Sequence, residues 1–365
     1  MQMLKTRRRI IFFLFEGAEH LSSEKIGFEE SLKSHVVDAG KCAGCAACVV
    51  SCPFFCLEYS DGKPKLIKEC ESCGICLRVC PRYQWNTQEM EKHVFGRQHS
   101  GNEPFGVFRR VVLARAVDEE ILERCQDGGL VSALLAFALE HNVIEAAVVS
   151  GVSSEKPFHP VPRLATTREQ ILECSGTRYT YSPNMLALQE AAKQKKKAVA
   201  FVGTPCQIQA LRKMEAARLK KYVAPIKFAI GLMCTESFTY EGLIEEHIKN
   251  RLGISPEQIK KMNIKGKIIV ETLSGEEKII PLKEAKAYTR QGCHHCRDFS
   301  SELADISAGG LGLTNWTFAV IRTEKGEKIF ESAEKAGAIT TKPVDKEGKA
   351  WRLLHLLSNK KRGVK

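Results

Sequence analysis

Cysteine occurs twice in one spacing near the start of this 365-residue chain. The first copy is C-A-G-C-A-A-C-V-V-S-C-P, from Cys42 to Pro53, and the second is C-E-S-C-G-I-C-L-R-V-C-P, from Cys70 to Pro81. In C-x2-C-x2-C-x3-C-P, three thiolates surround one [4Fe–4S] cluster and the fourth cysteine binds the other cluster of a pair. The spacing therefore predicts two clusters that carry single electrons, one on Cys42, Cys45, Cys48 and Cys80 and the other on Cys70, Cys73, Cys76 and Cys52.

Four more cysteines are spread over the second half of the chain. Cys206 follows a predicted strand at the start of a helix, Cys234 ends another strand, and Cys293 and Cys296 form a C-x2-C pair. Strand ends and helix N-termini can bring such side chains together, and a helix N-terminus favours the thiolate form that metals bind. The four thiols could hold a third [4Fe–4S] cluster or a structural zinc ion, and inert buried thiols are the third interpretation.

A two-electron donor that feeds one-electron clusters needs a converter, and flavin is the usual one. The chain has neither G-x-G-x-x-G nor a P-loop, so any flavin phosphates must be bound in another way. Three short segments could do so, although glycine pairs also serve turns and helix caps. Their residues are Gln126, Asp127, Gly128 and Gly129 before an apolar helix, Ser175, Gly176, Thr177, Arg178 and Tyr179 in S-G-T-R-Y-T, and Ser307, Gly309 and Gly310 after a predicted strand.

The elements that must position these residues alternate between strands and helices. The predicted strands are residues 107–117, 143–150, 198–202 and 225–233, and the predicted helices are residues 129–141, 184–197 and 240–252, with another that begins at Pro205. This alternation predicts an α/β domain with a mixed or mainly parallel sheet. The predicted order is an N-terminal extension (1–40), an eight-cysteine domain (41–85) with a hairpin turn at Asp61-Gly62, a linker (86–106), an α/β domain (107–340) and a basic C-terminal tail (341–365).

Composition narrows the class of protein. The net charge is +12, and residues 193–227 contain ten Lys or Arg and a single acid, Glu215. Such density attracts polyanions or keeps a surface solvated, but no aromatic-interleaved basic stripe indicates nucleic acid. No apolar stretch approaches the ~20 residues of a spanning helix.

The 15 cysteines indicate metal binding in a reducing, anaerobic cytosol rather than a disulfide scaffold, because disulfides favour small secreted domains. Three of them, Cys56, Cys125 and Cys174, match no ligand spacing, and we interpret them as small buried residues.

Seven segments together resemble a known family. They are Q-D-G-G (126–129), S-G-T-R-Y-T (175–180), G-T-P-C-Q (203–207), G-L-M-C-T-E-S-F (231–238), C-H-H-C-R-D-F (293–299), A-D-I-S-A-G-G-L-G (304–312) and V-I-R-T-E-K-G-E-K-I-F (320–330). In this order, behind the doubled motif, the chain resembles the beta subunits of coenzyme F420 hydrogenases and dehydrogenases from about Cys42 to Phe330. It is most similar to the F420-oxidising, electron-input subunit of F420-dependent dehydrogenases that feed a membrane quinone or phenazine pool.

The resemblance implies an α/β flavoprotein domain with a mixed sheet, preceded by a small bacterial-type 2[4Fe–4S] ferredoxin domain. It implies FAD in residues 107–340 and a third [4Fe–4S] cluster on Cys206, Cys234, Cys293 and Cys296. Reduced F420, a deazaflavin, would pass a hydride to FAD, and single electrons would leave through the clusters. No side chain need act as a catalytic acid or base. The implied protein is a cytoplasmic oxidoreductase docked on a membrane-bound redox complex, and its basic excess suits the phosphate and poly-glutamate tail of F420.

Two alternatives remain open. One is the F420-reactive beta subunit of a hydrogenase, a formate dehydrogenase or a sulfite-reducing system. The other is a non-catalytic iron–sulfur electron-transfer adaptor. The chain also departs from the family pattern, because Arg178 stands where members usually carry Lys and Asn315 precedes Trp316 where glycine is common.

Overall fold

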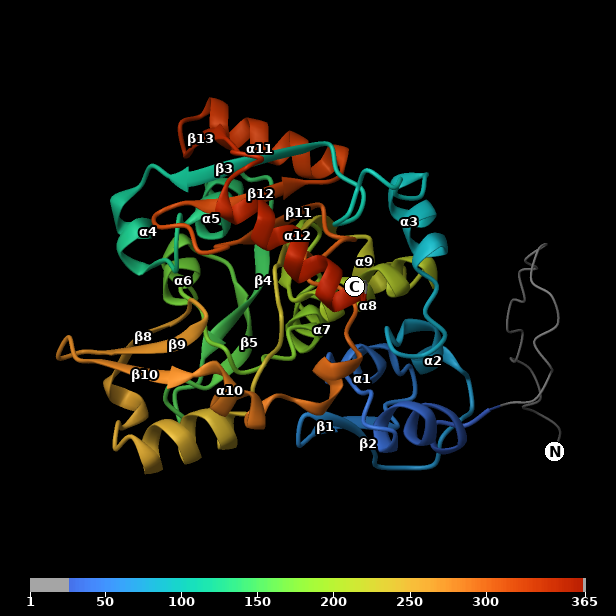
Figure 1. The fold of residues 1–365 in the computed structure, drawn as a ribbon. Helices are drawn as coiled ribbons and strands as arrows, with labels where there is room; N and C mark the ends of the chain where they lie inside the picture. Colours follow the sequence, from blue (N-terminus) through green and yellow to red (C-terminus); the bar gives the residue numbers. More distant parts are fainter. Residues whose placement is uncertain (1–25, 364–365) are drawn as a thin grey trace, which may run out of the picture.

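An eight-stranded mixed sheet forms the centre of residues 26–363, the part of the chain that the computed structural model describes (Figure 1). The strand order is β13-β3-β12-β11-β7-β6-β4-β5. Strands β11, β7, β6 and β4 run parallel, and the outer strands pair antiparallel to their neighbours. Their bounds are β3 (Arg110–Ala116), β4 (Ala146–Val152), β5 (Pro160–Ala165), β6 (Val199–Gly203), β7 (Ile226–Leu232), β11 (Ile306–Gly309), β12 (Thr317–Ile321) and β13 (Ile339–Pro343). The predicted mixed sheet is confirmed.

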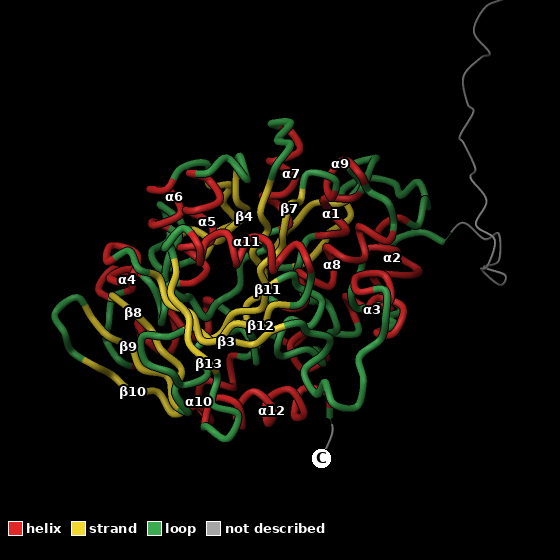
Figure 2. Tube along the Cα trace, turned by 90° about the horizontal axis from the view of Figure 1, so that it is seen from above, coloured by secondary structure: helices red, strands yellow, loops and turns green. Residues whose placement is uncertain are grey.

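Helices cover both faces of this sheet because its strands bury alternate side chains on opposite sides. In β12, Ala319 and Ile321 join the core beneath α5 and α11, whereas Phe318 and Val320 pack toward α12. Figure 2 shows α11 and α12 on opposite sides of β11, β12 and β3. The helix bounds are α4 (Glu119–Arg124), α5 (Leu130–Glu140), α6 (Arg168–Glu173), α7 (Met185–Lys193), α8 (Pro205–Ala216), α9 (Lys220–Val223), α11 (Glu324–Lys335) and α12 (Lys349–Arg362).

Residues 41–85 form a small unit against the α7 and α8 side of the sheet, which we call the eight-cysteine unit (Figure 1). Its elements are α1 (Ala47–Ser51), β1 (Leu57–Ser60), β2 (Lys63–Leu66) and α2 (Ile75–Val79). Asp61 and Gly62, with φ of 49° and 74°, form the predicted hairpin turn. The predicted N-terminal extension is structured in part, because helix η1 (Glu29–Asp38) packs on this unit, and its residues 1–25 lie outside the described part of the chain.

The segment predicted as a linker contains helix α3 (Thr87–Phe95). Asn86 accepts hydrogen bonds from the backbone N–H groups of Gln88 and Glu89, and Gly96 ends the helix with φ of 70°. Met90 is buried against α8, so this mostly polar segment makes an apolar contact with the α/β domain. Local caps therefore form a helix where composition alone indicated a loop.

A three-stranded antiparallel sheet, absent from the sequence prediction, forms a lobe beside the main sheet (Figure 1). It consists of β8 (Ile259–Ile264), β9 (Lys267–Thr272) and β10 (Glu277–Pro281). Helix η2 (Glu241–Arg251), which matches the helix predicted at 240–252, packs on it through Leu243 and Ile248. Short turns complete the segment: η3 (Pro256–Gln258), α10 (Leu282–Ala285), η4 (Lys286–Tyr288) and η5 (Gln291–His295).

The predicted basic tail folds back as helix α12. Leu354 is fully buried and packs with Phe318 of β12, so apolar residues at helical spacing hold this basic segment on the domain. At its end, Arg362 pairs with Glu302 at 2.7 Å. Between residues 26 and 363, no helix is both long and apolar enough to cross a membrane.

Candidate functional site

The doubled motif places its eight cysteines in two groups, and each group contains one residue from the other copy. The inner set, Cys42, Cys45, Cys48 and Cys80, lies within mutual electrostatic range. Burial raises the pKa of Cys80 to about 11, so a bound cation or cluster is needed to hold these groups as thiolates. The structure thus brings together the residues that the spacing assigns to one cluster.

The outer set, Cys52, Cys70, Cys73 and Cys76, lines a common pocket at the edge of the unit. Burial raises the pKa of Cys76 to about 12, and the nearby thiols of Cys73 and Cys70 add to the effect. Cys73 is exposed, whereas Cys45, Cys48 and Cys80 of the inner set are buried. One group therefore lies in the interior and the other reaches the surface.

The four cysteines of the second half meet in one pocket, which we call the four-cysteine site. Cys206 is the second residue of α8, directly after β6, and Cys234 follows the end of β7. Cys293 lies in the short turn η5, and Cys296 ends it. The carboxyl ends of two parallel strands and one loop therefore bring together residues that lie far apart in the sequence.

Polar groups surround the sulfur atoms of this site. Thr204 Oγ1 and the Tyr181 hydroxyl lie 3.3 and 3.6 Å from Cys206 Sγ, and the Ser237 N–H donates to Cys293 Sγ at 3.4 Å. Burial raises the pKa of Cys234 well above its usual value, and the thiols of Cys293 and Cys206 raise it further. Such buried thiols become thiolates only with compensating positive charge.

Three cationic side chains line the same pocket: Arg82, Arg290 and Lys361. The Arg290 guanidinium carbon lies 4.0 Å from the centre of the Tyr181 ring, and Lys361 Nζ donates to the Cys293 carbonyl at 3.2 Å. Their charges would offset those of bound thiolates. The donor set and its surroundings fit a [4Fe–4S] cluster.

Two metal interpretations apply to the four-cysteine site, a [4Fe–4S] cluster and a zinc ion. Among residues 26–363, no group of three or more His, Cys, Asp or Glu side chains is arranged to hold a single metal ion. A zinc ion requires four sulfur atoms about 2.3 Å from one centre, whereas a cluster spreads its ligands over four irons. Four cysteine thiolates are ligands that both groups use, and His294 and His295 inside the C-x2-C pair are exposed.

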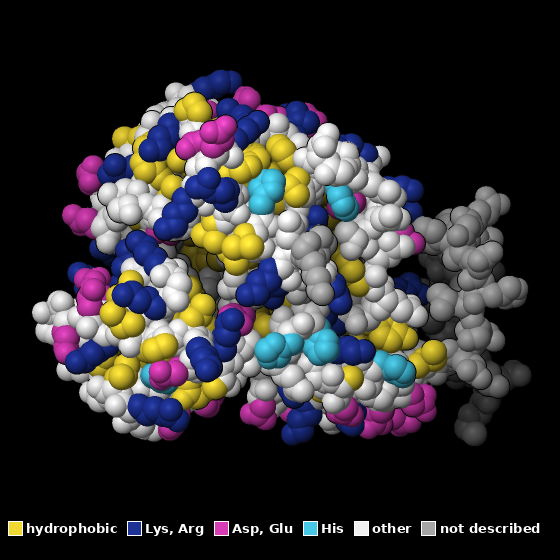
Figure 3. Space-filling model, in the orientation of Figure 1, with side chains coloured by type: hydrophobic (Ala, Val, Ile, Leu, Met, Phe, Trp, Pro, Cys, Tyr) yellow, Lys and Arg dark blue, Asp and Glu magenta, His cyan; other side chains and the backbone are white. Residues whose placement is uncertain are grey.

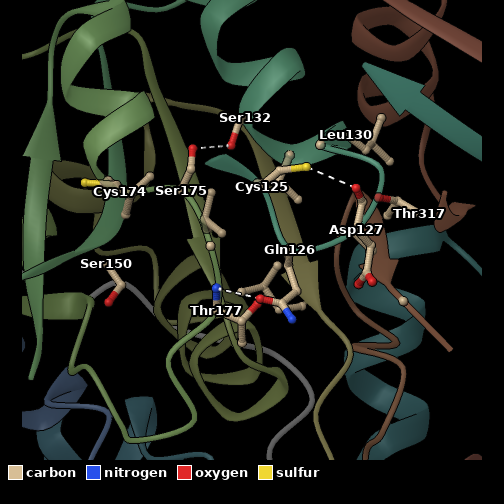
Figure 4. A pocket seen from close by; sticks show the side chains of 18 of the residues that line it. Cys125, Gln126, Asp127, Leu130, Ser132, Ser150, Cys174, Ser175, Thr177 and Thr317 are labelled. Carbon is tan, nitrogen blue, oxygen red and sulfur yellow. Dashed lines mark hydrogen bonds between the residues drawn. The ribbon is translucent and has the colours of Figure 1, made fainter. Parts of the chain in front are cut away.

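The three predicted phosphate-binding segments converge on one pocket of about 310 Å³, which we call the motif pocket (Figure 4). Ten of the predicted residues line it: Gln126, Asp127, Gly129, Ser175, Gly176, Thr177, Arg178, Tyr179, Gly309 and Gly310. The walls between them are mostly apolar, as is usual for cofactor sites.

Gly128 and Ser307 do not line the motif pocket. A Cβ at Gly128 would lie 2.5 Å from the backbone nitrogen of Thr317, so this glycine permits close packing of two segments. Ser307 is fully buried, donates to the Ser301 carbonyl and accepts a hydrogen bond from Arg322 Nε. Both predicted residues are therefore part of the packing around the pocket and do not line it.

Helix α5 points its N-terminus into the motif pocket. Gly129 is the N-cap residue with φ of 71°, and no side chain caps this end. The first backbone N–H groups of a helix lack intrahelical acceptors and bind anions well. Gln126 links the segment before this helix to two other segments. Its Oε1 accepts from Thr177 N at 3.3 Å (Figure 4), and its Nε2 donates to the Met262 carbonyl at 2.9 Å.

The β8–β10 lobe contacts two residues that line the pocket, Gln126 and Tyr179. The Tyr179 hydroxyl accepts from Ile264 N at 3.2 Å, and burial raises the pKa of Tyr179 to about 12. Burial also raises the pKa of Asp127, while Lys261 and Lys265 of the lobe act in the opposite direction. In the space-filling view, Lys and Arg side chains border the hollow between this lobe and the main sheet (Figure 3). Basic side chains of the lobe therefore lie near the pocket residue Asp127.

Arg178 is turned toward its own loop. Its Nη1 donates to the carbonyls of Cys174 and Gly176 at 3.0 and 3.1 Å, which holds the S-G-T-R-Y-T loop in shape. Sequence reasoning missed two residues here, because Cys125 and Cys174 line the pocket instead of being only small buried residues. The signal that could have found them was their position, each directly before a predicted segment.

The motif pocket and the four-cysteine site adjoin along two parallel strands. Val202 and Met233 line the pocket, and Cys206 and Cys234, a few residues further along the same two segments, line the cysteine site. Cofactors of open α/β sheets bind at such carboxyl ends. The two sites are therefore direct neighbours.

The four-cysteine site also contacts the eight-cysteine unit. Cys206 lies within electrostatic range of Cys42 and Cys45, and Arg290 Nη1 donates to the Ala43 carbonyl at 3.0 Å. A Cβ at Gly292 would lie 2.1 Å from the Cys42 carbonyl oxygen, which shows how closely the loop approaches. The order in space is motif pocket, four-cysteine site, inner set and outer set.

Comparison with known proteins defines the class to which this fold and these sites belong. Residues 111–189 match the N-terminal model, and residues 196–347 the C-terminal model, of the coenzyme F420 hydrogenase/dehydrogenase beta subunit. The chain belongs to this family, as the sequence motifs predicted.

Three curated relatives show how far the likeness extends. The coenzyme F420 hydrogenase subunit beta of Methanosarcina barkeri is 39% identical, over 70% of this chain and 89% of its own length. An F(420)H(2) dehydrogenase subunit of Methanosarcina mazei is 32% identical, over 82% of this chain and 84% of its own length. The coenzyme F420-dependent sulfite reductase of Methanocaldococcus jannaschii is 33% identical over 86% of this chain, which spans about half (49%) of that protein.

A solved structure confirms the fold. A chain of the F420-reducing [NiFe] hydrogenase complex from Methanosarcina barkeri superposes with a TM-score of 0.68 at 37% identity, over 71% of this chain and 90% of that chain. The mixed α/β architecture is therefore shared with a chain of a solved F420-reducing complex.

Proposed function

We propose that this chain oxidises reduced coenzyme F420 by hydride transfer to FAD in the motif pocket and passes the electrons singly through three [4Fe–4S] clusters to a partner complex. The observation that carries the proposal is the spatial order of the sites. A pocket suited to phosphates adjoins the four-cysteine site, that site adjoins the inner set, and the outer set ends at exposed Cys73. Such an order suits an electron path that begins in the motif pocket and ends at the surface of the eight-cysteine unit.

The motif pocket supports a flavin through three properties. The open N-terminus of α5 offers backbone donors to a phosphate, and side chains such as Leu135, Val149 and Ile171 offer apolar walls to a ring system. Hydrogen bonds from Gln126 and Tyr179 to the β8–β10 lobe hold these two pocket residues in place. When bound, FAD supplies the conversion of a hydride into single electrons.

The reaction balances without a catalytic acid or base. Each reduced F420 loses two electrons and two protons; one proton leaves with the electron pair as hydride, and the solvent receives both protons as the electrons depart. The side chains of this chain bind and orient the two ring systems, which is the main requirement for hydride transfer. This role agrees with a pocket rich in glycine and apolar residues.

The basic side chains of the β8–β10 lobe support an acidic substrate. Lys261 and Lys265 lie near Asp127 at the lobe side of the pocket, where the phosphate and poly-glutamate tail of F420 would find compensating charge. The basic run at 193–227 contributes less to this, since Arg212 is buried in an ion pair with Asp305 at 3.1 Å and Lys213 donates to the Tyr83 carbonyl.

The relatives do not fix the direction of electron flow, which would depend on the partner. Their names include a hydrogenase subunit, a dehydrogenase subunit and a sulfite reductase, and the same series of sites would reduce F420 if the partner supplied the electrons. The likenesses to the dehydrogenase subunit, over 82% of this chain, and to the sulfite reductase, over 86%, both extend into the first 106 residues, and of the two roles we propose the oxidising one. We propose a cytoplasmic location, with docking on the cytoplasmic face of a membrane complex.

One assay tests this function. The chain is purified anaerobically, its iron and flavin are counted, and oxidation of reduced F420 is followed with a viologen acceptor. We expect one FAD, about twelve irons at four per cluster, and turnover. Bound iron without flavin or turnover would instead identify an electron-transfer adaptor, and about eight irons would remove the third cluster.

A further inference from the structure

The two copies of the cysteine motif differ in the residue after the C-P pair, which is Phe54 in the first copy and Arg82 in the second. Phe54 is 43% exposed and lines the pocket of the outer set. Arg82 instead points into the molecule and lines the four-cysteine site. The repeat is therefore asymmetric at the point where the eight-cysteine unit meets the α/β domain.

Arg82 contacts two sulfur sets at once. Its backbone N–H donates to Cys80 Sγ of the inner set at 3.4 Å. Its side chain lines the four-cysteine site, within electrostatic range of Cys296 and Cys206. Nη1 also donates to Gln209 Oε1 of α8 at 3.3 Å, which holds the side chain across the boundary.

One donor of this side chain has no partner. Arg82 Nε is buried and makes no hydrogen bond to any residue that the structure describes. A buried N–H without an acceptor is costly, and native proteins rarely retain one without a reason. The sulfur atoms of a [4Fe–4S] cluster accept hydrogen bonds, so a cluster in this pocket would provide the acceptor.

We propose that Arg82 is a positioning residue that couples the third cluster to the inner cluster and raises the midpoint potential of the third cluster. The inference rests on the proposed function, since it requires clusters at both cysteine sets. A nearby positive charge favours the reduced cluster, which carries one more negative charge than the oxidised one. One electron moves from the third cluster to the inner cluster, and no bond or proton changes.

Arg82 comes from the eight-cysteine unit and not from the α/β domain. It lies outside residues 111–189 and 196–347, which match the family models, so the eight-cysteine unit supplies it to the part of the fold that the family shares. Arg290 also lies within electrostatic range of Cys42, Cys293 and Cys206, and its Nη1 donates to the Ala43 carbonyl rather than to a sulfur of the inner set. Arg82 therefore joins the two sulfur sets, through its N–H to Cys80 and through the side chain that lines the four-cysteine site.

The test uses the full chain with its cofactors and compares Arg82→Gln, Arg82→Lys and Arg78→Gln. Arg78 is exposed on α2 of the same unit, so its variant removes the same charge without touching the four-cysteine site. The readouts are iron content, a redox titration followed by electron paramagnetic resonance, and the rate of cluster reduction after mixing with reduced F420. The third cluster is identified as the signal that Cys293→Ser lacks.

We expect Arg82→Gln to retain its iron, to lower the midpoint potential of the third cluster and to slow reduction of the inner cluster by about 10-fold or more, with flavin reduction unchanged. Arg82→Lys keeps the charge but not the forked donor geometry, so a smaller decrease is expected. If Arg82→Gln loses iron, the midpoint potential of the third cluster in Arg82→Lys is the test.

An unchanged midpoint potential in an iron-replete Arg82 variant would overturn the inference, as would an equal shift in Arg78→Gln. Failure of the proposed function gives a different result, because a wild-type chain without flavin or with about eight irons has no third cluster to titrate.

Discussion

The eight-cysteine unit and the four-cysteine site bring the same kind of side chain together by different means. In the unit, all the motif cysteines lie between residues 42 and 80 and follow one short repeat. In the site, they come from the start of α8, the end of β7 and the turn η5. The contrast teaches that a ligand set can be specified by the local path of the backbone or by the packing of distant elements.

The backbone of the unit repeats as its sequence does. Helices α1 and α2 follow Ala46 and Gly74, which have φ of 66° and 70°, and they end at Cys52 and Cys80 in extended conformations. Each copy therefore presents its cysteines through the same local geometry. The four-cysteine site has no such repeat, and its arrangement depends on the pairing of β6 with β7 and on the loop that contacts Cys42.

The largest predicted effect comes from removing one ligand in each region. Cys293→Ser should lose about four of about twelve irons and block electron flow from the flavin to the inner cluster, while the flavin is still reduced. Cys73→Ser should lose the outer cluster alone, because its thiol is exposed at the far end of the series. Iron analysis and stopped-flow spectroscopy with reduced F420 measure both. Equal loss of inner-cluster reduction in the two variants would contradict the proposed order.

The next effect concerns the contact between the two regions. Gly292→Ala would place a Cβ 2.1 Å from the Cys42 carbonyl oxygen, so the loop with Cys293 must move away from the inner set. We expect full iron content but transfer between the two clusters slower by about 10-fold or more. Gly101→Ala is the matched control, because no atom lies within 4 Å of the position that its methyl group would take. A Gly292→Ala variant with the wild-type rate would show that the close approach is unnecessary.

A third substitution tests whether the motif pocket is separable from the cysteine sites. In Gly310→Ala, the new Cβ would overlap the Asp127 carboxylate at 2.3 Å. Overpacking of this size costs about 1–3 kcal/mol, enough to weaken flavin binding by about 10-fold or more. Flavin content after gel filtration should decrease while iron content stays constant. Loss of iron without loss of flavin would be the opposite of this expectation.

The smallest effect concerns the local backbone of the repeat. Gly74→Ala meets no atom within 4 Å, but φ of 70° strains any residue with a Cβ. The expected cost is about 1 kcal/mol of stability, measured by chemical denaturation of the holoprotein. Ala46 already occupies the equivalent place in the first copy, so Ala46→Gly should be close to neutral. A larger loss in Ala46→Gly would mean that methyl packing outweighs strain there.

Much of the fold was predictable because it follows from local patterns. The apolar runs that became β3, β4, β6 and β7 and the helix at α5 lie within a few residues of their predicted bounds. The helix at 87–95 was missed because its caps, Asn86 and Gly96, lie in a polar stretch typical of loops. The β8–β10 lobe was missed because antiparallel pairing depends on contacts that alternation along one segment does not reveal.

The candidate site also combines features that the sequence predicted with features that only packing decided. The sequence identified the three segments of the motif pocket, but only packing decided that Ser307 faces Arg322 and that Cys125 and Cys174 line the pocket. No spacing rule could assign Arg82 to the four-cysteine site, since Cys296 of that site lies more than two hundred residues away.

By itself, the sequence determined the two groups within the doubled motif, because a fixed spacing of cysteines and glycines sets the path of a short backbone. It also determined family membership, because seven segments occur in one order. The tertiary structure alone decided that the inner set lies against the four-cysteine site and that the outer set reaches the surface. The physical reason is that adjacency between sites depends on which faces of the unit and of the sheet bury their apolar residues against each other, and no single segment contains that information.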